Sequence, residues 1–225
     1  MRRFILWGIA AGLVLFALVT SVGVRVGVLA DATPRPEGPW LWIASRAAGI
    51  TAFAALTLDT LFGLLASTGA LDRAVSRARS VEVHRWLATV SLSLTAAHVL
   101  ALLGDRYVRF DALAALVPLL SPYRPEAVAL GSFAAYGGAI VTASFALKSV
   151  IGARAWRLLH ALSFAVFASA LAHGVLAGSD SGDPAMRAFY LVSGASVVAL
   201  VAYRVVAMAI RAASPARPRS PGGIV

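Results

Sequence analysis

Four histidines are the side chains in this sequence best suited to metal chemistry, and they occur as two similarly spaced pairs. His84 and His98 bracket thirteen residues that carry one charge, and His160 and His173 bracket twelve that carry none. A neutral imidazole donates a nitrogen lone pair to a metal ion. On an α-helix the two intervals correspond to rises of roughly 21 Å and about 20 Å. Each helix would therefore present one imidazole at each of two levels.

The composition indicates a membrane protein of the all-α class. Hydrophobic residues make up 60% of the 225 residues and charged residues 13%, and the mean hydropathy is +0.82. A soluble core of this size cannot bury so much apolar surface. The net charge of +10 does not indicate nucleic-acid binding, because the basic residues lie mostly between apolar segments. With no cysteine, the chain cannot form disulfides, thiolate-bound clusters or attached c-type haem.

Six apolar segments are long enough to cross a bilayer, which takes roughly 20 helical residues. They are residues 4–24, 42–67, 86–103, 127–147, 158–176 and 188–210. We expect one six-helix domain over residues 1–211, a short interfacial helix in 104–126 that Pro118 and Pro122 stop, and a disordered tail at 212–225.

Basic residues between the spans predict the orientation. With the N-terminus in the cytoplasm, twelve Lys and Arg residues face inward and six outward, which favours both termini in the cytoplasm. Trp40, Trp42, Trp86 and Trp156 then lie near span ends, as in an aromatic belt. An alternative for the start is a signal peptide cleaved after Ala30, but the apolar run is long for one and Arg25 interrupts it.

The third and fifth spans run in the same direction under this topology. His84 and His160 would therefore pair near the inner face, and His98 and His173 near the outer face. Two flat haem b groups, each held between facing imidazoles, suit this geometry. A zinc site suits it poorly, because ligands fourteen residues apart on one helix cannot meet at one ion. The alternative is that the histidines are buried polar residues that hold helices together.

The fifth span presents a geometric difficulty. A fourteen-residue interval returns a side chain to within about 40° of its starting direction, but thirteen residues leave it roughly 140° away on a straight helix. The fifth helix must therefore be twisted or tilted, or the two cofactors must lie against different sides of it. Gly174, beside His173, could help.

The sequence from about residue 40 to 205 resembles the ferric reductase-like transmembrane domain family. This family includes NADPH oxidases, ferric reductases and the haem-binding membrane subunit of a periplasmic methionine sulfoxide reductase system. The resemblance lies in the spacing of His84/His98 and His160/His173, and in "SRAAGITAFAALTLDTLFGLLAST", "WRLLHALSF" and "AHGVLAGSDSG". It implies that His84 and His160 ligate an inner haem and that His98 and His173 ligate an outer haem.

The resemblance also implies an electron-transfer function in a bacterial inner membrane. The chain has no G-x-G-x-x-G fingerprint, so we expect it to lack its own FAD/NADPH domain. A separate flavoprotein or a quinol would then supply electrons, with FMN, FAD or quinone brought by that partner, and a periplasmic reductase could accept them. The alternatives are direct reduction of ferric iron or another small acceptor and, in another class, a transporter or structural bundle without cofactor.

Several charged residues could assist. Arg85, Arg154 and Arg157 lie beside the inner histidines and could pair with haem propionates; the alternative, which we favour, is that they anchor the chain at the inner face. Arg46, in the second span, could reach an outer propionate or extend to the interface. Asp59, deeper in that span, could carry protons, bind a quinone or pair with a nearby cation.

Overall fold

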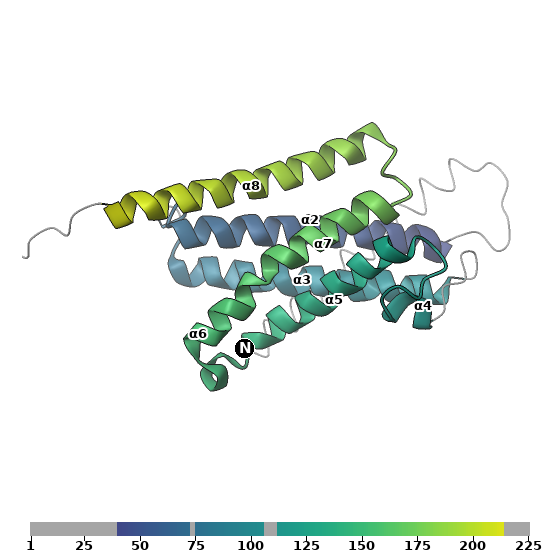
Figure 1. Ribbon diagram of the computed structural model, residues 1–225, viewed down its shortest axis with the longest axis horizontal. Coiled ribbons are helices and arrows are strands. Elements are labelled where there is room, and N and C mark those ends of the chain that lie inside the picture. Colours follow the sequence, from purple (N-terminus) through teal and green to yellow (C-terminus); the bar gives the residue numbers. More distant parts are fainter. Residues whose placement is uncertain (1–39, 73–74, 106–111, 214–225) are drawn as a thin grey trace, which may run out of the picture.

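The computed structural model describes residues 40–72, 75–105 and 112–213, and every regular element within these ranges is a helix. In chain order the helices are α2 (Trp40–Thr68), α3 (Arg77–Gly104), α4 (Ala112–Leu116), α5 (Pro125–Ser144), α6 (Lys148–Ala161), α7 (Ser163–Ala177) and α8 (Pro184–Ala213) (Figure 1). The all-α prediction is confirmed for this part of the chain. The predicted first span and the alternative cleavage site lie outside the described residues.

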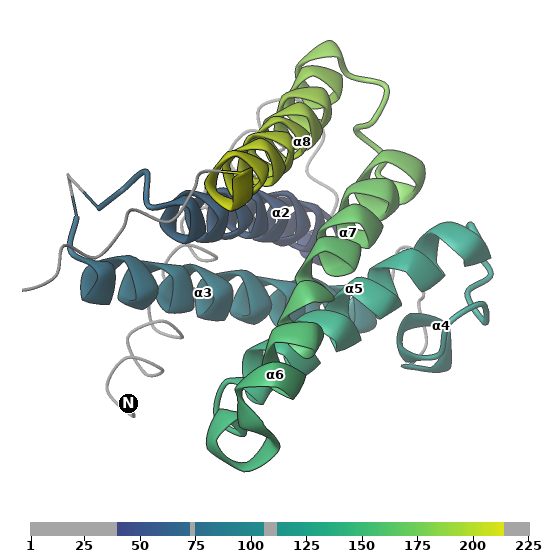
Figure 2. The same cartoon turned by 60° about the vertical axis from the view of Figure 1, so that its left-hand side comes forward.

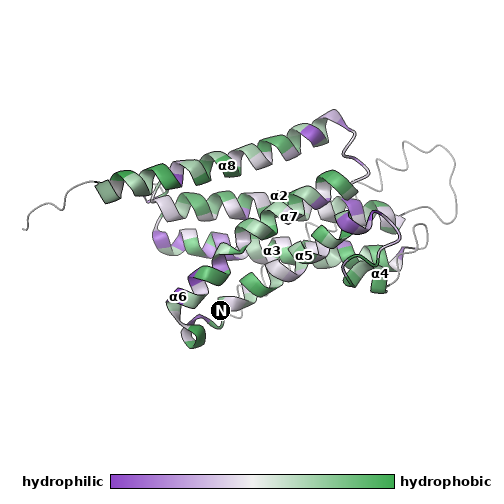
Figure 3. Cartoon of the chain, viewed as in Figure 1, coloured by the Kyte–Doolittle hydropathy of each residue, from purple (hydrophilic) through white to green (hydrophobic). Residues whose placement is uncertain are grey.

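Five helical stretches of the described ranges are long and apolar enough to cross a membrane: α2, α3, α5, α6 with α7, and residues Pro184–Ile210 of α8. Many large apolar side chains of these helices face outward, including Val150, 80% exposed, and Leu191, 72% exposed. Exposure of such an apolar surface to water is unfavourable, whereas lipid tails solvate it. Figure 3 shows that hydrophobic residues cover most of the long helices and that hydrophilic residues gather near some helix ends, such as the start of α3. The chain is a multi-pass membrane protein.

The helices pack as neighbouring pairs around a shared interior. α2 lies antiparallel along α3, α5 packs along α7, and α8 contacts α2 (Figures 1 and 2). The continuous path of α6 and α7 crosses α3 obliquely and runs in the same general direction (Figure 2). The two histidine-bearing segments therefore run in the same sense, as the predicted order of spans requires, but at an oblique angle to each other.

Small residues set the close approach of α2 to α3. Ala44, Ala48, Ala52 and Ala55 of α2 are buried, and Ala52 and Ala55 pack against buried residues of α3. Small side chains let membrane helices approach closely and gain van der Waals contact where no hydrophobic driving force exists between them. The Ser91 hydroxyl of α3 adds a hydrogen bond to the Ala52 carbonyl at 3.1 Å. α2 is thus held at a defined height against the first histidine helix.

An aromatic cluster joins α2 to the last two helices. The ring of Phe53 lies 5.7 Å from that of Phe167 on α7, 5.6 Å from Phe189 and 5.7 Å from Tyr190 on α8, between centroids. Such aromatic pairs add roughly 0.5–1.5 kcal/mol each beyond the burial of their surface. The cluster therefore fixes α7, which carries His173, against α2.

The predicted fifth span is broken between its two histidines. α6 ends at Ala161 and α7 begins at Ser163, and the Leu162 amide donates to the Leu159 carbonyl at 3.1 Å, an i→i−3 bond. Such a bond belongs to a tighter turn of about 120° per residue, compared with about 100° in an α-helix. The extra rotation acts in the direction that brings His160 and His173 toward one side of the helix. The break supplies part of the rotation of roughly 140° that the thirteen-residue interval leaves open.

The remaining boundaries differ in detail from the prediction. α3 begins at Arg77, so His84 lies two turns inside the helix and not at its end. α4 lies in the connection where we expected a short helix, and it ends just before Pro118. α8 continues to Ala213, two residues into the segment predicted as tail, and residues 214–225 lie outside the described ranges.

A glycine with positive φ bends the start of α6. Gly152 has φ 80° and ψ 159°, a conformation that residues with a Cβ rarely adopt. Because no neighbouring atom lies within 4 Å of the place that a Cβ would take, backbone strain is the main effect of adding one. Gly152→Ala is expected to lower the free energy of unfolding by roughly 1–3 kcal/mol. Unfolding in mixed micelles would measure it.

Gly182 supplies the matched control for this prediction. It also has open space around a Cβ position, but its φ lies outside the strained range. Gly182→Ala should leave the free energy of unfolding nearly unchanged. Equal stability of the two variants would contradict the role assigned to the backbone at Gly152.

Candidate functional site

The four histidines meet as two pairs across α3 and the α6–α7 path. The ring centroids of His84 and His160 are 5.9 Å apart, and those of His98 and His173 are 6.4 Å apart. The first histidine of each pair in the sequence therefore lies beside the first of the other, and the second beside the second, as the intervals predict. Two imidazoles that bind one metal from opposite sides, each through a bond of about 2 Å, have ring centroids roughly 6 Å apart. Both pairs have the separation that a shared metal would need.

Hydrogen bonds orient three of the four rings. Nδ1 of His98 lies 2.7 Å from the Ser45 carbonyl, Nδ1 of His173 lies 2.7 Å from the Ala127 carbonyl, and Nδ1 of His84 lies 3.2 Å from the Asp59 carbonyl. A carbonyl only accepts, so each Nδ1 carries the proton and donates it. The other ring nitrogen, Nε2, then keeps its lone pair. This is the tautomer and the orientation that a metal-binding imidazole requires.

A glycine lies beside each of these three carbonyls. Gly49, Gly63 and Gly131 each come four residues after the residue whose carbonyl accepts from the histidine. A Cβ at these positions would lie 2.9 Å from His98, 3.0 Å from His84 and 2.7 Å from His173. Only glycine leaves room for the imidazole to reach the backbone of the neighbouring helix. Each of the three glycines therefore makes room for one histidine ring against the neighbouring helix.

The fourth ring is held differently. His160 stacks on Trp156, one turn earlier in α6, with centroids 5.0 Å apart and ring planes inclined by 15°. The Lys148 ammonium lies 4.2 Å from the centre of the same indole, and Phe145 contacts its edge. Within the described ranges no hydrogen bond is made by the His160 ring. Stacking, and not a carbonyl, therefore sets its orientation.

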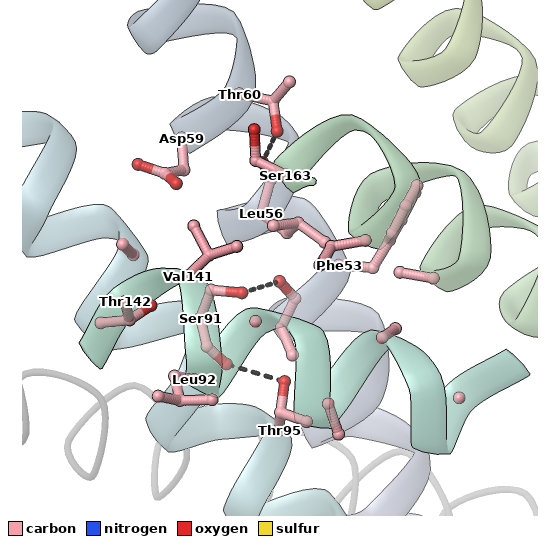
Figure 4. Close-up of a pocket in the computed structure, with 18 of the residues that line it drawn as sticks. Phe53, Leu56, Asp59, Thr60, Ser91, Leu92, Thr95, Val141, Thr142 and Ser163 are labelled. Carbon is pink, nitrogen blue, oxygen red and sulfur yellow. Dashed lines mark hydrogen bonds between the residues drawn. The ribbon is translucent and has the colours of Figure 1, made fainter. Parts of the chain in front are cut away.

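All four histidines line one cavity of about 1290 Å³. This exceeds the roughly 300–1,000 Å³ of most small-molecule pockets, so it can hold more than one drug-sized group. Its walls come from all the helices from α2 to α8, and many wall residues are alanine or glycine. Figure 4 shows the middle of the cavity, where Phe53 and Asp59 of α2, Ser91 of α3 and Thr142 of α5 lie around the space.

Unpartnered polar atoms also mark the cavity. Oγ of Ser80 and Nε1 of Trp156 are buried and make no hydrogen bond to any part of the chain that the structure describes. Both residues line the cavity near the His84/His160 pair. Unsatisfied buried donors are costly, and a bound group with acceptor oxygens would satisfy them. The donor set, the small walls and these two atoms all fit a haem with its propionates.

The four arginines that we expected to pair with haem propionates lie in different surroundings. Arg46 forms an ion pair with Asp180, with Nε 2.9 Å from Oδ2, and this pair lies at the cavity wall. Arg85 places its guanidinium 4.4 Å from the centre of the Phe145 ring, and Arg157 lines the cavity. Arg154 is exposed on α6 and does not line the cavity, so the geometry gives no support to its proposed role.

Sequence reasoning overlooked several residues of the site. Arg204 of α8 lines the cavity, although an arginine inside an apolar span was itself a signal of function. The seating glycines and Trp156 were also overlooked as site residues. The glycines carried a signal in the recurring four-residue offset, but the offset gains meaning only when the facing histidine is known.

A metal site built from three or more protein side chains is not found in the described residues. No three His, Asp or Glu side chains in residues 40–72, 75–105 and 112–213 converge as they would around a metal bound by protein alone. No protein-family model, curated protein or solved structure matches the chain. The fold and the site define it as a multi-pass helical membrane protein with paired histidines on its apolar helices.

Proposed function

We propose that the chain is a six-span cytochrome b of a bacterial inner membrane that transfers electrons across the bilayer. His84 and His160 would hold one haem b, and His98 and His173 a second. The observation that carries the proposal is the pairing of imidazoles about 6 Å apart at two levels, three with Nδ1 donated to a carbonyl. When bound, such haems supply one-electron redox chemistry.

The chain's own residues would hold, orient and insulate the two groups. Gly49, Gly63 and Gly131 let three rings approach the carbonyls that fix them, and α2 and α5 supply those carbonyls. With two histidines as its ligands, a haem at either level would have no position left for a substrate, which favours electron transfer. The walls of the cavity are mostly apolar, which would disfavour water beside the bound groups. Arg85, Arg157 and Arg204 line the cavity, and we propose that they neutralise acidic groups of a bound haem.

The direction of transfer and the partners follow from the expected topology and the family resemblance. We propose that both termini face the cytoplasm, which places the His84/His160 pair toward the donor side. A separate flavoprotein or a quinol would reduce it, and a periplasmic reductase or a small acceptor such as ferric iron would take the electrons. Reduction of ferric chelates by the purified chain with a flavin reductase would favour the second acceptor.

A reduced-minus-oxidised absorbance spectrum with a haem titration tests the proposal. Protein purified from haem-replete cells is expected to show a b-type spectrum and to contain about two haems per chain, one for each imidazole pair. Protein from haem-deficient cells, reconstituted with haemin, should reach the same ratio. A colourless protein that takes up no haemin would exclude the proposed function and favour a cofactor-free bundle.

A further inference from the structure

The two histidine levels differ in what surrounds the rings. At the His98/His173 level the Nδ1 atoms meet backbone carbonyls and, for His98, the neutral Ser45 hydroxyl at 3.0 Å. At the other level Nδ1 of His84 also lies 2.7 Å from Oδ1 of Asp59. Asp59 is the one acidic side chain among the described residues that contacts a histidine. The carboxylate therefore distinguishes one level from the other.

The placement of Asp59 is costly. Its side chain lies in the middle of α2, only 7% of the residue is exposed, and it faces the cavity (Figure 4). In the described part of the chain, no arginine or lysine forms an ion pair with it. Inserting a charged carboxylate into a membrane span without a cationic partner costs about 3 kcal/mol of free energy on scales measured from membrane insertion. The carboxylate contacts the ring of His84, so its charge acts most strongly on that ring.

The Nδ1–H of His84 donates to the Asp59 carbonyl, so the carboxylate acts on the ring through its charge at 2.7 Å and not as the hydrogen-bond acceptor. A negative charge this close to a metal-bound histidine stabilises the higher oxidation state of the metal. Reduction adds one electron to Fe(III) and gives Fe(II), with no bond made or broken and the Nδ1 proton retained. A negative charge at this position opposes that reduction, because the oxidised centre carries one more positive charge.

We propose that Asp59 is a positioning residue that lowers the reduction potential of the centre held by His84 and His160, relative to the same centre without the carboxylate. This rests on the proposed function. Lowering the potential at one level only makes electron flow toward the His98/His173 level more favourable. The carboxylate thereby gives the pair of centres a preferred direction, which the histidines and glycines alone do not.

Potentiometric titration of an Asp59→Asn variant tests the proposal. Asparagine keeps the shape and an acceptor oxygen but removes the charge. The titration is made in a His98→Ala background, where only the His84/His160 centre is expected to remain, so the measured potential belongs to one site. We expect the midpoint potential to rise and the spectrum of the ferric centre in electron paramagnetic resonance to change, with haem still bound.

Two further variants make the test selective. Asp72→Asn removes the same charge from an exposed position in the α2–α3 turn and should leave the potential unchanged. Asp59→Glu keeps the charge and should leave the potential closer to that of Asp59 than to that of the Asn variant. In the otherwise unaltered protein, Asp59→Asn should move one of the two midpoint potentials and leave the other in place.

The outcomes separate this proposal from the proposed function. An unaltered protein without haem overturns the proposed function itself. Two haems with no upward shift in Asp59→Asn, or an equal shift in Asp72→Asn, overturn the role of Asp59 and leave the function standing. If the Asn variant loses the centre, an unshifted potential in Asp59→Glu supports the role. Loss of the centre from both variants overturns it, because Asp59 would then be needed for binding and not for the potential.

Discussion

Replacing His98 with alanine is expected to reduce the haem content from about two per chain to about one. The reason is that His98 shares its site with His173 alone, and the chain has no other histidine to substitute for it beyond the pair at the other level. The remaining centre should keep its spectrum, because the His84/His160 rings lie about four helical turns away. Extraction of haem and its quantification against protein concentration measures the change.

Double variants test the pairing itself. His98→Ala with His173→Ala removes both ligands of one site, so it should leave about one haem, as each single variant does. His98→Ala with His84→Ala removes one ligand from each site and should leave none. If the first double variant lost both haems, or the second kept one, the histidines would be paired differently from the arrangement in the structure.

Replacing Gly131 with alanine is expected to weaken haem binding at the His98/His173 site without touching either ligand. The new Cβ would lie 2.7 Å from Nδ1 and 2.8 Å from Cε1 of His173, so the ring must move away from the Ala127 carbonyl. Loss of a hydrogen bond that orients a metal-bound histidine costs roughly 10–100-fold in metal affinity. Competition for haem by an apo-globin, followed by absorbance, measures the affinity.

Gly138, on the same helix, provides the control. An added Cβ there would lie 3.7 Å from Val166, an ordinary van der Waals contact. Gly138→Ala should therefore bind two haems with unchanged affinity, and Gly131→Ala should retain the His84/His160 centre. Equal behaviour of the two variants would mean that the approach of His173 to α5 has no part in holding a cofactor.

Much of the architecture could be predicted from the sequence, because a bilayer restricts the choice. Every backbone group in the apolar interior must be satisfied within its own segment, so an apolar run of roughly 20 residues becomes a helix. Five of the six predicted spans correspond to helices of the described chain, and the first predicted span, residues 4–24, lies outside the described residues. Boundaries were less predictable. α3 begins nine residues before Trp86, because helix propensity does not stop where hydropathy falls.

The surroundings of the histidines could not be predicted in the same way. Arg46 pairs with Asp180, 134 residues away in the chain, and the sequence alone did not indicate this partner. Arg154 and Arg157 are close in sequence, yet only Arg157 lines the cavity. The direction of a side chain depends on how its helix is rotated against its neighbours, and no local pattern specifies that rotation.

By itself, the sequence determined the all-helical membrane class and the two levels of histidines, since the rise per residue along a helix is constant and the intervals on the two helices nearly match. Only the tertiary structure decided which ring faces which carbonyl, that Gly49, Gly63 and Gly131 make room for them, and that a carboxylate touches His84 but not His98. Height along a helix is a local property. Contact across helices depends on their rotation, tilt and the break at Leu162, which arise only when all the helices pack together.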